Sequence, residues 1–211
     1  MPLTNVIESE YELRTVFPPP AGGAVAKQID ELDDHCRAFL AHSPFLVLGT
    51  TNPEGTGDTS PKGGPAGFVK VLDANTVAFG ELPGNYRIDG FRNIVRDRRV
   101  GLIFFIPGLD ESLRINGTAV IVRDPDVLAA CSIDDKLPKV AVVVTTNEIF
   151  IHCGKAMRRS SLWKRDGWPD VSDMATVACM LVAHVKVPGD PDGTKTGRML
   201  EKGYAATMWN E

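Results

Sequence analysis

The residues from 58 to 71 combine glycines, prolines and two lysines, a set that could hold an anionic ligand close to the backbone. Three glycines and two prolines lead straight into a strand-forming run, and glycine weakens a strand unless a ligand or another backbone must come close. Lys62 and Lys70 lie on either side and supply positive charge. A Gly/Pro surface loop before an edge strand explains the same composition, so both interpretations stay open.

A second stretch, Pro83 to Asn93, falls where a strand is expected to give way to a helix. Pro83-Gly84 turns the chain, and Asn85 is a residue type that caps helix N-termini. The free N–H groups of such a terminus, with Arg87 and Lys70, would form a phosphate site. A capped helix with a basic face in solvent is the alternative, and it needs no ligand.

A third stretch, residues 152–163, places cations, hydroxyls and a tryptophan after a strand. Such residues suit an anion and a flat ring. They equally suit a subunit interface, where Arg and Trp are enriched. The candidates here are Lys155, Arg159, Ser160 and Trp163.

Other kinds of site are not indicated. The sequence has no Ser/His/Asp elbow, no H-E-x-x-H, no P-loop and no dinucleotide fingerprint. The pairs Asp33-Asp34 and Asp134-Asp135 are expected in solvent rather than in a catalytic site. No cysteine lies in a C-x-x-C pair or at zinc-finger spacing from a histidine, so we expect no metal site. Free thiols in a reducing cytoplasm are expected instead.

Composition excludes several classes of partner. A net charge of −4 gives no global basic field for nucleic acid or anionic lipid. Hydrophobic residues make up 43% and charged residues 24%, as in a globular protein with a real core. The longest apolar runs, 100–107 and 140–144, are too short to cross a bilayer. The first residues lack a basic region followed by a long apolar one, so we expect a cytoplasmic protein.

Hydrophobic periodicity predicts the elements that position these stretches. Residues 1–26 are expected to form an arm, because the Pro and Gly run at 18–23 suits neither a helix nor a central strand. Apolar residues at helical spacing predict helices over about 27–42, 87–97, 125–130 and 170–185, and residues 187–198 suggest a loop. Strand patterns fall at 45–50, 67–72, 76–79, 100–106, 113–122, 140–146 and 148–153.

Many strands with short turns and few helices predict a mainly β (α+β) fold, an antiparallel barrel of about six strands with flanking helices. The expected organisation is an N-terminal arm over 1–26 and a barrel domain over 27–165. A C-terminal helix and tail over 166–211 is expected to pack on the same domain.

Four ordered motifs across most of this chain resemble pyridoxamine 5′-phosphate oxidase and its relatives, in particular a bacterial subgroup of uncertain substrate. Any one of them alone would be weak. Together they are specific: Ser60-Pro61-Lys62-Gly63 with Gly67-Phe68-Val69; Pro83-Gly84-Asn85-Tyr86-Arg87 with Asn93-Ile94; Gly101-Leu102-Ile103-Phe104 with Pro107-Gly108 and Glu111 to Gly117; and Cys153-Gly154-Lys155-Ala156 with Arg159 to Trp163.

The resemblance implies a split β-barrel that binds flavin mononucleotide (FMN) in a groove between the subunits of a homodimer. The family's cofactor strand ends in a lysine that falls on Lys70, and its phosphate-gripping turn falls on Asn85-Tyr86-Arg87. A pair that reaches the flavin from the partner chain falls on Arg159-Ser160. The implied cofactor-binding residues are Ser60, Pro61, Lys62, Gly63, Phe68, Val69, Lys70, Asn85, Tyr86, Arg87, Asn93, Lys155, Arg159, Ser160 and Trp163.

Two departures from the family pattern bear on activity. Pro65 stands where the oxidase has an arginine, so Lys62 could have taken over that charge. The oxidase's C-terminal Trp and Arg have no clear counterpart, which argues against oxidation of pyridoxamine phosphate itself. The resulting expectation is an FMN-dependent oxidoreductase acting on an unidentified small molecule, with no catalytic residue assigned. The alternative is a non-catalytic FMN- or haem-binding carrier or sensor.

Overall fold

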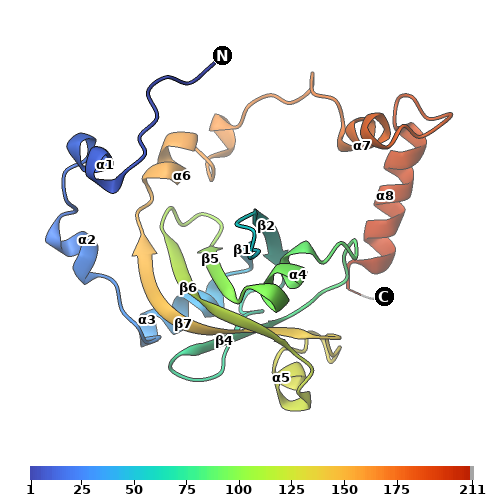
Figure 1. The fold of residues 1–211 in the computed structure, drawn as a ribbon. Coiled ribbons are helices and arrows are strands. Elements are labelled where there is room, and N and C mark those ends of the chain that lie inside the picture. The colour runs from blue at the N-terminus through green and yellow to red at the C-terminus, as the bar shows by residue number, and fades with distance from the viewer. Residues whose placement is uncertain (210–211) are drawn as a thin grey trace.

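The computed structural model describes residues 1–209, which form seven strands in one antiparallel sheet (Figure 1). The order across the sheet is β2-β1-β5-β6-β7-β4-β3, so β2 and β3 are its edges and the barrel is split rather than closed. The mainly β, split-barrel expectation is confirmed, with seven strands in the sheet where a barrel of about six was expected. The strands are β1 Phe45–Thr51, β2 Gly57–Gly63, β3 Lys70–Val71, β4 Thr76–Gly80, β5 Arg99–Phe105, β6 Ser112–Val122 and β7 Ala141–His152.

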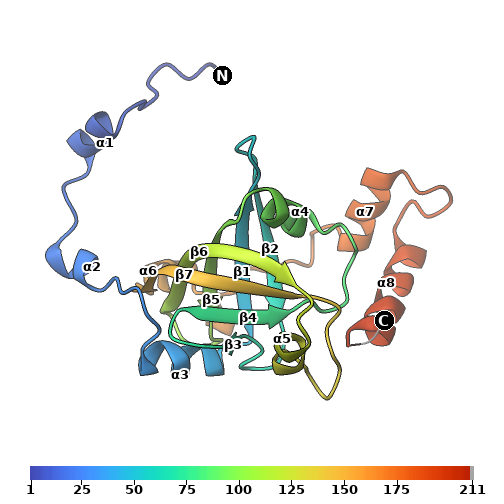
Figure 2. The same cartoon turned by 60° about the horizontal axis from the view of Figure 1, so that its bottom comes forward.

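Helices flank this sheet, and in Figure 2 α3 and α4 lie at opposite ends of the barrel. No helix of the described residues is long and apolar enough to span a membrane. The helices are α1 Glu10–Val16, α2 Gly22–Ala26, α3 Asp34–His42, α4 Asp89–Arg96, α5 Pro125–Ala130, α6 Lys155–Ser160, α7 Val177–Val185 and α8 Thr194–Thr207, with a 3₁₀ turn at Arg165–Gly167.

The core lies inside the curved sheet because alternate residues of each strand point inward. Leu46 and Leu48 are buried on β1, while the residues between them on the outer face stay partly exposed. Helices α3 and α4 close the two ends with Leu40 and Ile94. Other fully buried side chains of this core are Phe79, Phe104, Leu113, Ile115, Val142 and Ile149.

The N-terminal helices differ from the expectation. The helix expected over 27–42 begins only at Asp34, because the Asp33 carboxylate accepts a hydrogen bond from the Cys36 N–H (2.7 Å) and caps it. Residue 29 forms a bridge to β7 instead. Glycines 22 and 23 belong to the short helix α2, so the statement that this run cannot be helical was wrong.

The strand predictions also need correction. Residues 57–63, interpreted as a Gly/Pro stretch before a strand, form β2, and Pro61 fits there because an edge strand leaves one row of N–H groups unpaired. The strand expected over 67–72 shrinks to β3. The two strands expected over 140–153 form one long β7, and its pairing with β6 shifts register between Asn116 and Gly117 because β7 has one extra residue there, Asn147.

The C-terminal segment contains more helix than expected. The helix predicted over 170–185 begins at Val177, and the loop predicted over 187–198 gives way to α8 at Thr194. Asp190 stabilises this start by accepting hydrogen bonds from the Thr196 N–H (2.8 Å) and hydroxyl (2.7 Å). Helices α7 and α8 pack against each other. That residues 166–211 pack on the barrel as one domain stays a prediction.

Candidate functional site

A groove of about 740 Å³ lies between edge strand β2 and the segment that joins β4 to α4. It is lined on one side by residues 58–63 and on the other by residues 80–91, two segments that are distant in the sequence. Eight of the expected cofactor-binding residues lie here: Ser60, Pro61, Lys62, Gly63, Phe68, Asn85, Tyr86 and Arg87.

The register of β2 directs polar side chains into this groove. Lys62 pairs with Leu46 and Ser60 pairs with Leu48, and both leucines face the core. Side chains of paired residues lie on the same face of a sheet, so Lys62, Ser60 and Asp58 point inward. Burial along β2 alternates accordingly, with these three half-buried and their neighbours exposed. The cation and hydroxyl of this motif therefore face the groove together.

Lys62 is held by two groups of the opposite wall. Its Nζ lies 2.8 Å from a carboxylate oxygen of Glu81 and 5.1 Å from the ring centroid of Phe91. The Lys62 side chain is only 19% exposed and that of Glu81 28%. Charged groups this far from bulk water interact more strongly than surface pairs. The ammonium is thus fixed in the groove and partly neutralised there.

The Asn85–Arg87 turn is built differently from the expectation. Asn85 does not cap the helix: its side-chain oxygen accepts from the Arg87 N–H (3.1 Å) in a local turn. Helix α4 begins after Ile88, which has φ 50° and makes no side-chain cap. The Arg87 Nε lies 2.8 Å from Asp89, and its side chain is 74% exposed. The guanidinium therefore stands at the rim of the groove, with water on one side.

Strained backbone surrounds this arginine. Tyr86 has φ 57° and Ile88 has φ 50°, in the left-handed region that a branched side chain adopts only at a cost. Both side chains are more than half exposed, so burial of these side chains offsets little of that cost. Such strain is concentrated at ligand-binding turns, where the contact with the ligand makes the strained form useful.

This strain gives a stability prediction. Ile88→Gly is expected to raise the free energy of unfolding by about 0.5–1 kcal/mol, because glycine adopts φ 50° without the ~1–2 kcal/mol steric penalty but loses more backbone entropy. Ile88→Ala keeps the Cβ atom and is the matched control, expected to gain nothing. Urea unfolding of the three proteins measures this, and equal effects of Gly and Ala would contradict it.

Helix α4 is held close to the barrel by Asn93 and Gly90. The Asn93 side-chain amide donates to the Thr50 hydroxyl (3.0 Å) on β1, so Asn93 positions the helix rather than lining the groove. A Cβ atom at Gly90 would lie 3.7 Å from the Asp58 carboxylate and 3.8 Å from the Ser60 hydroxyl. These are ordinary contact distances, and they show that the first turn of α4 lies against β2.

Two further expected residues, Val69 and Lys70, also lie outside the groove. Val69 is a core residue, 4% exposed. Lys70 pairs with Ala78, which packs with Cys131 on the outer side of the sheet, and its Nζ donates to the Gly67 carbonyl (2.9 Å). Lys70 therefore faces away from Lys62 and Arg87, and a shared phosphate site within one chain is supported for the latter two only.

The α6 candidates also lie away from the groove of their own chain. Lys155, Arg159 and Ser160 are exposed, and Trp163 donates from its indole to the Leu109 carbonyl (2.9 Å). Helix α6 is fixed instead by Arg158, whose Nε lies 2.8 Å from Asp110. The Ser160 hydroxyl also donates to the Met157 carbonyl (3.1 Å), and none of the four candidates lines the groove of its own chain.

Sequence reasoning missed the acidic side of the groove. Among the described lining residues, the carboxylates of Asp58, Glu81 and Asp89 face the cations Lys62, Arg87 and Lys139. Asp58 could have been found from its alternation with Ser60 and Lys62, had β2 been identified as a strand. Glu81 carried no sequence signal, because it reaches Lys62 only across the fold.

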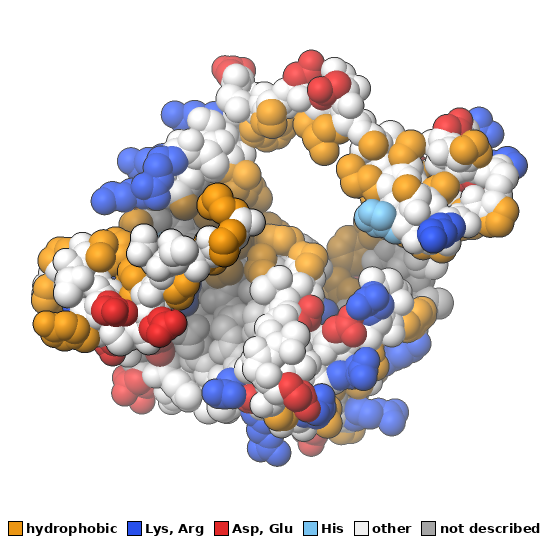
Figure 3. All heavy atoms as spheres, turned by 45° about the horizontal axis from the view of Figure 1, so that its top comes forward, with side chains coloured by type: hydrophobic (Ala, Val, Ile, Leu, Met, Phe, Trp, Pro, Cys, Tyr) orange, Lys and Arg blue, Asp and Glu red, His pale blue; other side chains and the backbone are white. Residues whose placement is uncertain are grey.

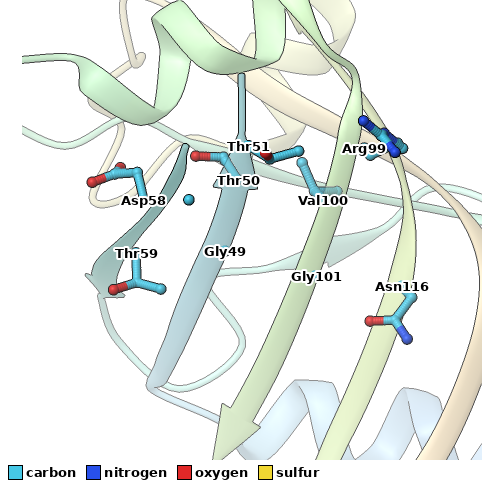
Figure 4. Close-up of a pocket in the computed structure, with 10 residues that line it drawn as sticks. Gly49, Thr50, Thr51, Asp58, Thr59, Arg99, Val100, Gly101 and Asn116 are labelled. Carbon is cyan, nitrogen blue, oxygen red and sulfur yellow. The ribbon is translucent and has the colours of Figure 1, made fainter. Parts of the chain in front are cut away.

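A second, shallower depression lies on the outer face of β1 and β5, with a volume of about 450 Å³ (Figure 4). Its floor is the pair Gly49 and Gly101, which face each other across the ladder without side chains. Arg99 at its edge pairs with Asp97, and the Arg99 guanidinium lowers the pKa of Asp97 to about 2. Asn116 donates to Glu148. This surface is flat, and the Arg99 cation that lines it is already paired.

His152, the last residue of β7, lies beside a pair of cations, Lys27 and Arg114. The Phe150 ring beside it lies 5.4 Å from the Lys27 ammonium and 5.0 Å from the Arg114 guanidinium. The His152 Nδ1 atom is buried and has no hydrogen-bond partner in the described residues. Burial, followed by the charges of Arg114 and Lys27, lowers the pKa of His152 below its ordinary 6.5.

This lowered pKa predicts a pH effect on stability. The folded protein binds a proton at His152 less readily than the unfolded chain, so the stability contribution is full above pH 6.5 and falls as pH drops below it. His152→Gln should remove that part of the pH dependence. Urea unfolding at about pH 7.5 and about pH 5.5 compares the two proteins. If wild type and His152→Gln lose the same stability between these two pH values, His152 is not the group responsible.

Comparison with known proteins places these features in a family. Residues 32–153, more than half of the chain, match the model of the pyridoxamine 5′-phosphate oxidase family. No curated protein matches. Similar solved structures include HupZ of Group A Streptococcus, with 18% identity over 56% of this chain and 92% of that one, at a TM-score of 0.45.

Two further solved structures are similar to the same extent. A putative pyridoxamine 5′-phosphate oxidase of Lactobacillus delbrueckii is 21% identical over 58% of this chain and 95% of that one, with a TM-score of 0.45. An FAD binding protein of Mycobacterium smegmatis is 20% identical over 59% and 97%, with a TM-score of 0.41. Likeness at this level assigns no function. The family-model match, which spans the barrel and the groove, does assign the family: the chain belongs to the pyridoxamine 5′-phosphate oxidase family.

Proposed function

We propose that this protein is an FMN-dependent oxidoreductase that works as a homodimer on a small-molecule substrate. One observation carries the proposal: the groove brings Lys62 and Ser60 from β2 together with Arg87 from the turn before α4. These are the motifs whose residues resemble the phosphate-binding positions of the family. Cations and hydroxyls converging on one concavity are suited to a phosphate group.

The described residues fit a phosphorylated flat ring. The volume of the groove, about 740 Å³, is within the range of sites that enclose a cofactor. Arg87 and Lys62 can take the phosphate, and the apolar lining residues can contact a ring: Leu48, Phe68, Leu82, Tyr86, Ile88 and Phe91. Bound FMN would supply the redox chemistry, and the chain would bind and orient it.

No side chain of the groove is assigned a proton-transfer role. Hydride transfer to a flavin does not require a protein acid or base. The groove residues are therefore proposed to act by binding: Arg87 and Lys62 on the phosphate, and the α4 start held in place through Asn93.

In a homodimer, α6 of one subunit would contact the flavin bound to its partner. Arg159 and Ser160 are exposed and lie outside the groove of their own chain, so a partner's groove is where they could contact flavin. The outer face of the sheet offers an apolar stripe for the contact, formed by Phe45, Val47, Ile103 and Phe105 beside the two glycines of Figure 4. Figure 3 shows further exposed hydrophobic side chains on both terminal segments.

The dimer is tested by measuring mass in solution with FMN present, by light scattering after gel filtration. We expect twice the 22.9 kDa chain mass. Arg159→Ala should weaken FMN binding without changing this mass. A monomer that retains FMN would contradict the dimer and the α6 role together.

The alternative is a non-catalytic carrier of FMN or haem. The absorbance of the purified protein, before and after a reductant is added, distinguishes it from the enzyme. Of the axial haem ligands His, Cys, Met and Tyr, the described residues that line the groove include only Tyr86. A yellow protein bleached by NAD(P)H supports the enzyme, and a yellow protein that no reductant bleaches supports the carrier. Mass spectrometry of the released cofactor identifies FMN, and a Soret band would point to haem instead.

A cytoplasmic location remains part of the proposal. The four cysteines, all within the described residues, are free. Burial raises the pKa of Cys36 to about 11 and also raises that of Cys131, so both remain thiols in the core. Unpaired thiols fit a reducing compartment.

A further inference from the structure

The ion pair between Lys62 and Glu81 spans the groove from one wall to the other. Lys62 comes from β2, and Glu81 directly follows β4, so the pair joins two strands that are not neighbours in the sheet. The Nζ to Oε2 distance is 2.8 Å, and both side chains are mostly shielded from water. A carboxylate on this ammonium takes one of its three N–H donors and offsets its charge, so it competes with a phosphate oxygen for Lys62.

Glu81 is held there by its backbone. Its N–H donates to the Val140 carbonyl (3.0 Å), which continues the β4 to β7 ladder by one residue. The backbone of Glu81 is therefore fixed to the sheet, and its carboxylate stays near the groove even when the side chain rotates away from Lys62.

Arg87, the other cation proposed to bind the phosphate, is far more exposed than Lys62. Arg87 and Asp89 also lie 2.8 Å apart, but the Arg87 side chain is 74% exposed. Water screens such a pair, so a ligand can recruit Arg87 with little loss. The two cations thus differ in how strongly an internal carboxylate opposes the ligand.

We propose that Glu81 is a specificity-determining residue: its carboxylate competes with the ligand phosphate for Lys62 and limits the preference of the groove for FMN over riboflavin. The proposal rests on the proposed function, because it takes flavin as the ligand. It concerns only the phosphate end, so the ring should bind independently of Glu81.

The test compares wild type with Glu81→Gln, which removes the charge but keeps the size. Titration of apo-protein with FMN and with riboflavin, followed by flavin fluorescence, gives two dissociation constants per protein. Removal of one negative charge close to the phosphate should tighten FMN binding roughly three- to tenfold at low salt. Riboflavin binding should not change.

Two further variants control the result. Glu54→Gln removes a carboxylate that pairs with Arg96 outside the groove, and it should change neither constant. Lys62→Met combined with Glu81→Gln should lose the gain in FMN affinity, because the released cation is absent. Thermal unfolding of each apo-protein checks that all variants are folded.

Each outcome decides. A gain for FMN alone supports the proposal. Equal changes for both flavins overturn it, because Glu81 would then act on the ring. No change in either constant overturns it, because Glu81 would then not affect binding. A loss of FMN affinity overturns it, because Glu81 would then help to position Lys62 for the phosphate. If wild type binds neither flavin, the proposed function fails. Protection by inorganic phosphate in thermal unfolding then tests the competition by itself: stronger protection of Glu81→Gln supports it, and equal protection or none rejects it.

Discussion

Arg87→Ala is expected to weaken FMN binding by roughly ten- to a hundredfold, because it removes a charge-assisted contact of about 1.5–3 kcal/mol. The loss is expected even though Arg87 pairs with Asp89, since that exposed pair contributes little by itself. Riboflavin, which lacks the phosphate, should bind both proteins equally. Fluorescence titration of apo-protein measures all four constants.

The control for this variant is Arg92→Ala. Arg92 lies one turn along α4, is 72% exposed and also approaches Asp89 (3.9 Å), but it does not line the groove. It should bind FMN as the wild type does. If Arg87→Ala and wild type have the same FMN affinity, the phosphate assignment to Arg87 is wrong and Lys62 becomes the next candidate.

The sequence predicts the barrel well where hydrophobic alternation is strong. Strand β5 follows from its run of apolar residues, and its inward side chains Leu102 and Phe104 are buried as such a run requires. Strand β2 was missed because Pro61 and the glycines around it lack strand propensity. Only its place at the sheet edge makes Pro61 acceptable, and that place depends on the whole topology.

The C-terminal helix α8 shows the opposite limit. Its glycines and the Pro and Gly residues before it argue for a loop, since glycine disfavours helix by about 1 kcal/mol per residue. The structure supplies what local propensity lacks: the carboxylate of Asp190 accepts from the first turn, and α7 packs alongside. Contacts of this kind cannot be read from a single segment.

The part of the site that lies within the family motifs could be predicted from the sequence. Lys62 and Arg87 are 25 residues apart in sequence, and only the resemblance placed them together before the structure did. The prediction that Asn85 caps α4 was wrong because Tyr86 and Ile88, which both have left-handed backbone, lie between Asn85 and the first residue of the helix. Glu81 and Phe91 were missed since their relation to Lys62 arises from strand order.

Gly117→Ala should produce the largest loss of stability among these variants. Gly117 is buried on β6 beside the register shift with β7, where a Cβ atom would lie 2.1 Å from the Thr145 carbonyl oxygen and 3.2 Å from the Thr146 Cα. These neighbours are backbone atoms of β7, so no rotamer change relieves the clash and one of the two central strands must shift.

Overpacking that moves backbone lowers the free energy of unfolding by roughly 2–4 kcal/mol, which lowers the melting temperature by about 5–15 °C for a chain of this size. Gly57→Ala is the matched control, because a Cβ atom there meets nothing within 4 Å, and its effect should stay within about 0.5 kcal/mol. Thermal and urea unfolding of the apo-proteins compare the variants. If both glycine variants are equally stable, the backbone around Gly117 accommodates the extra Cβ atom. The predicted clash with β7 would then be wrong.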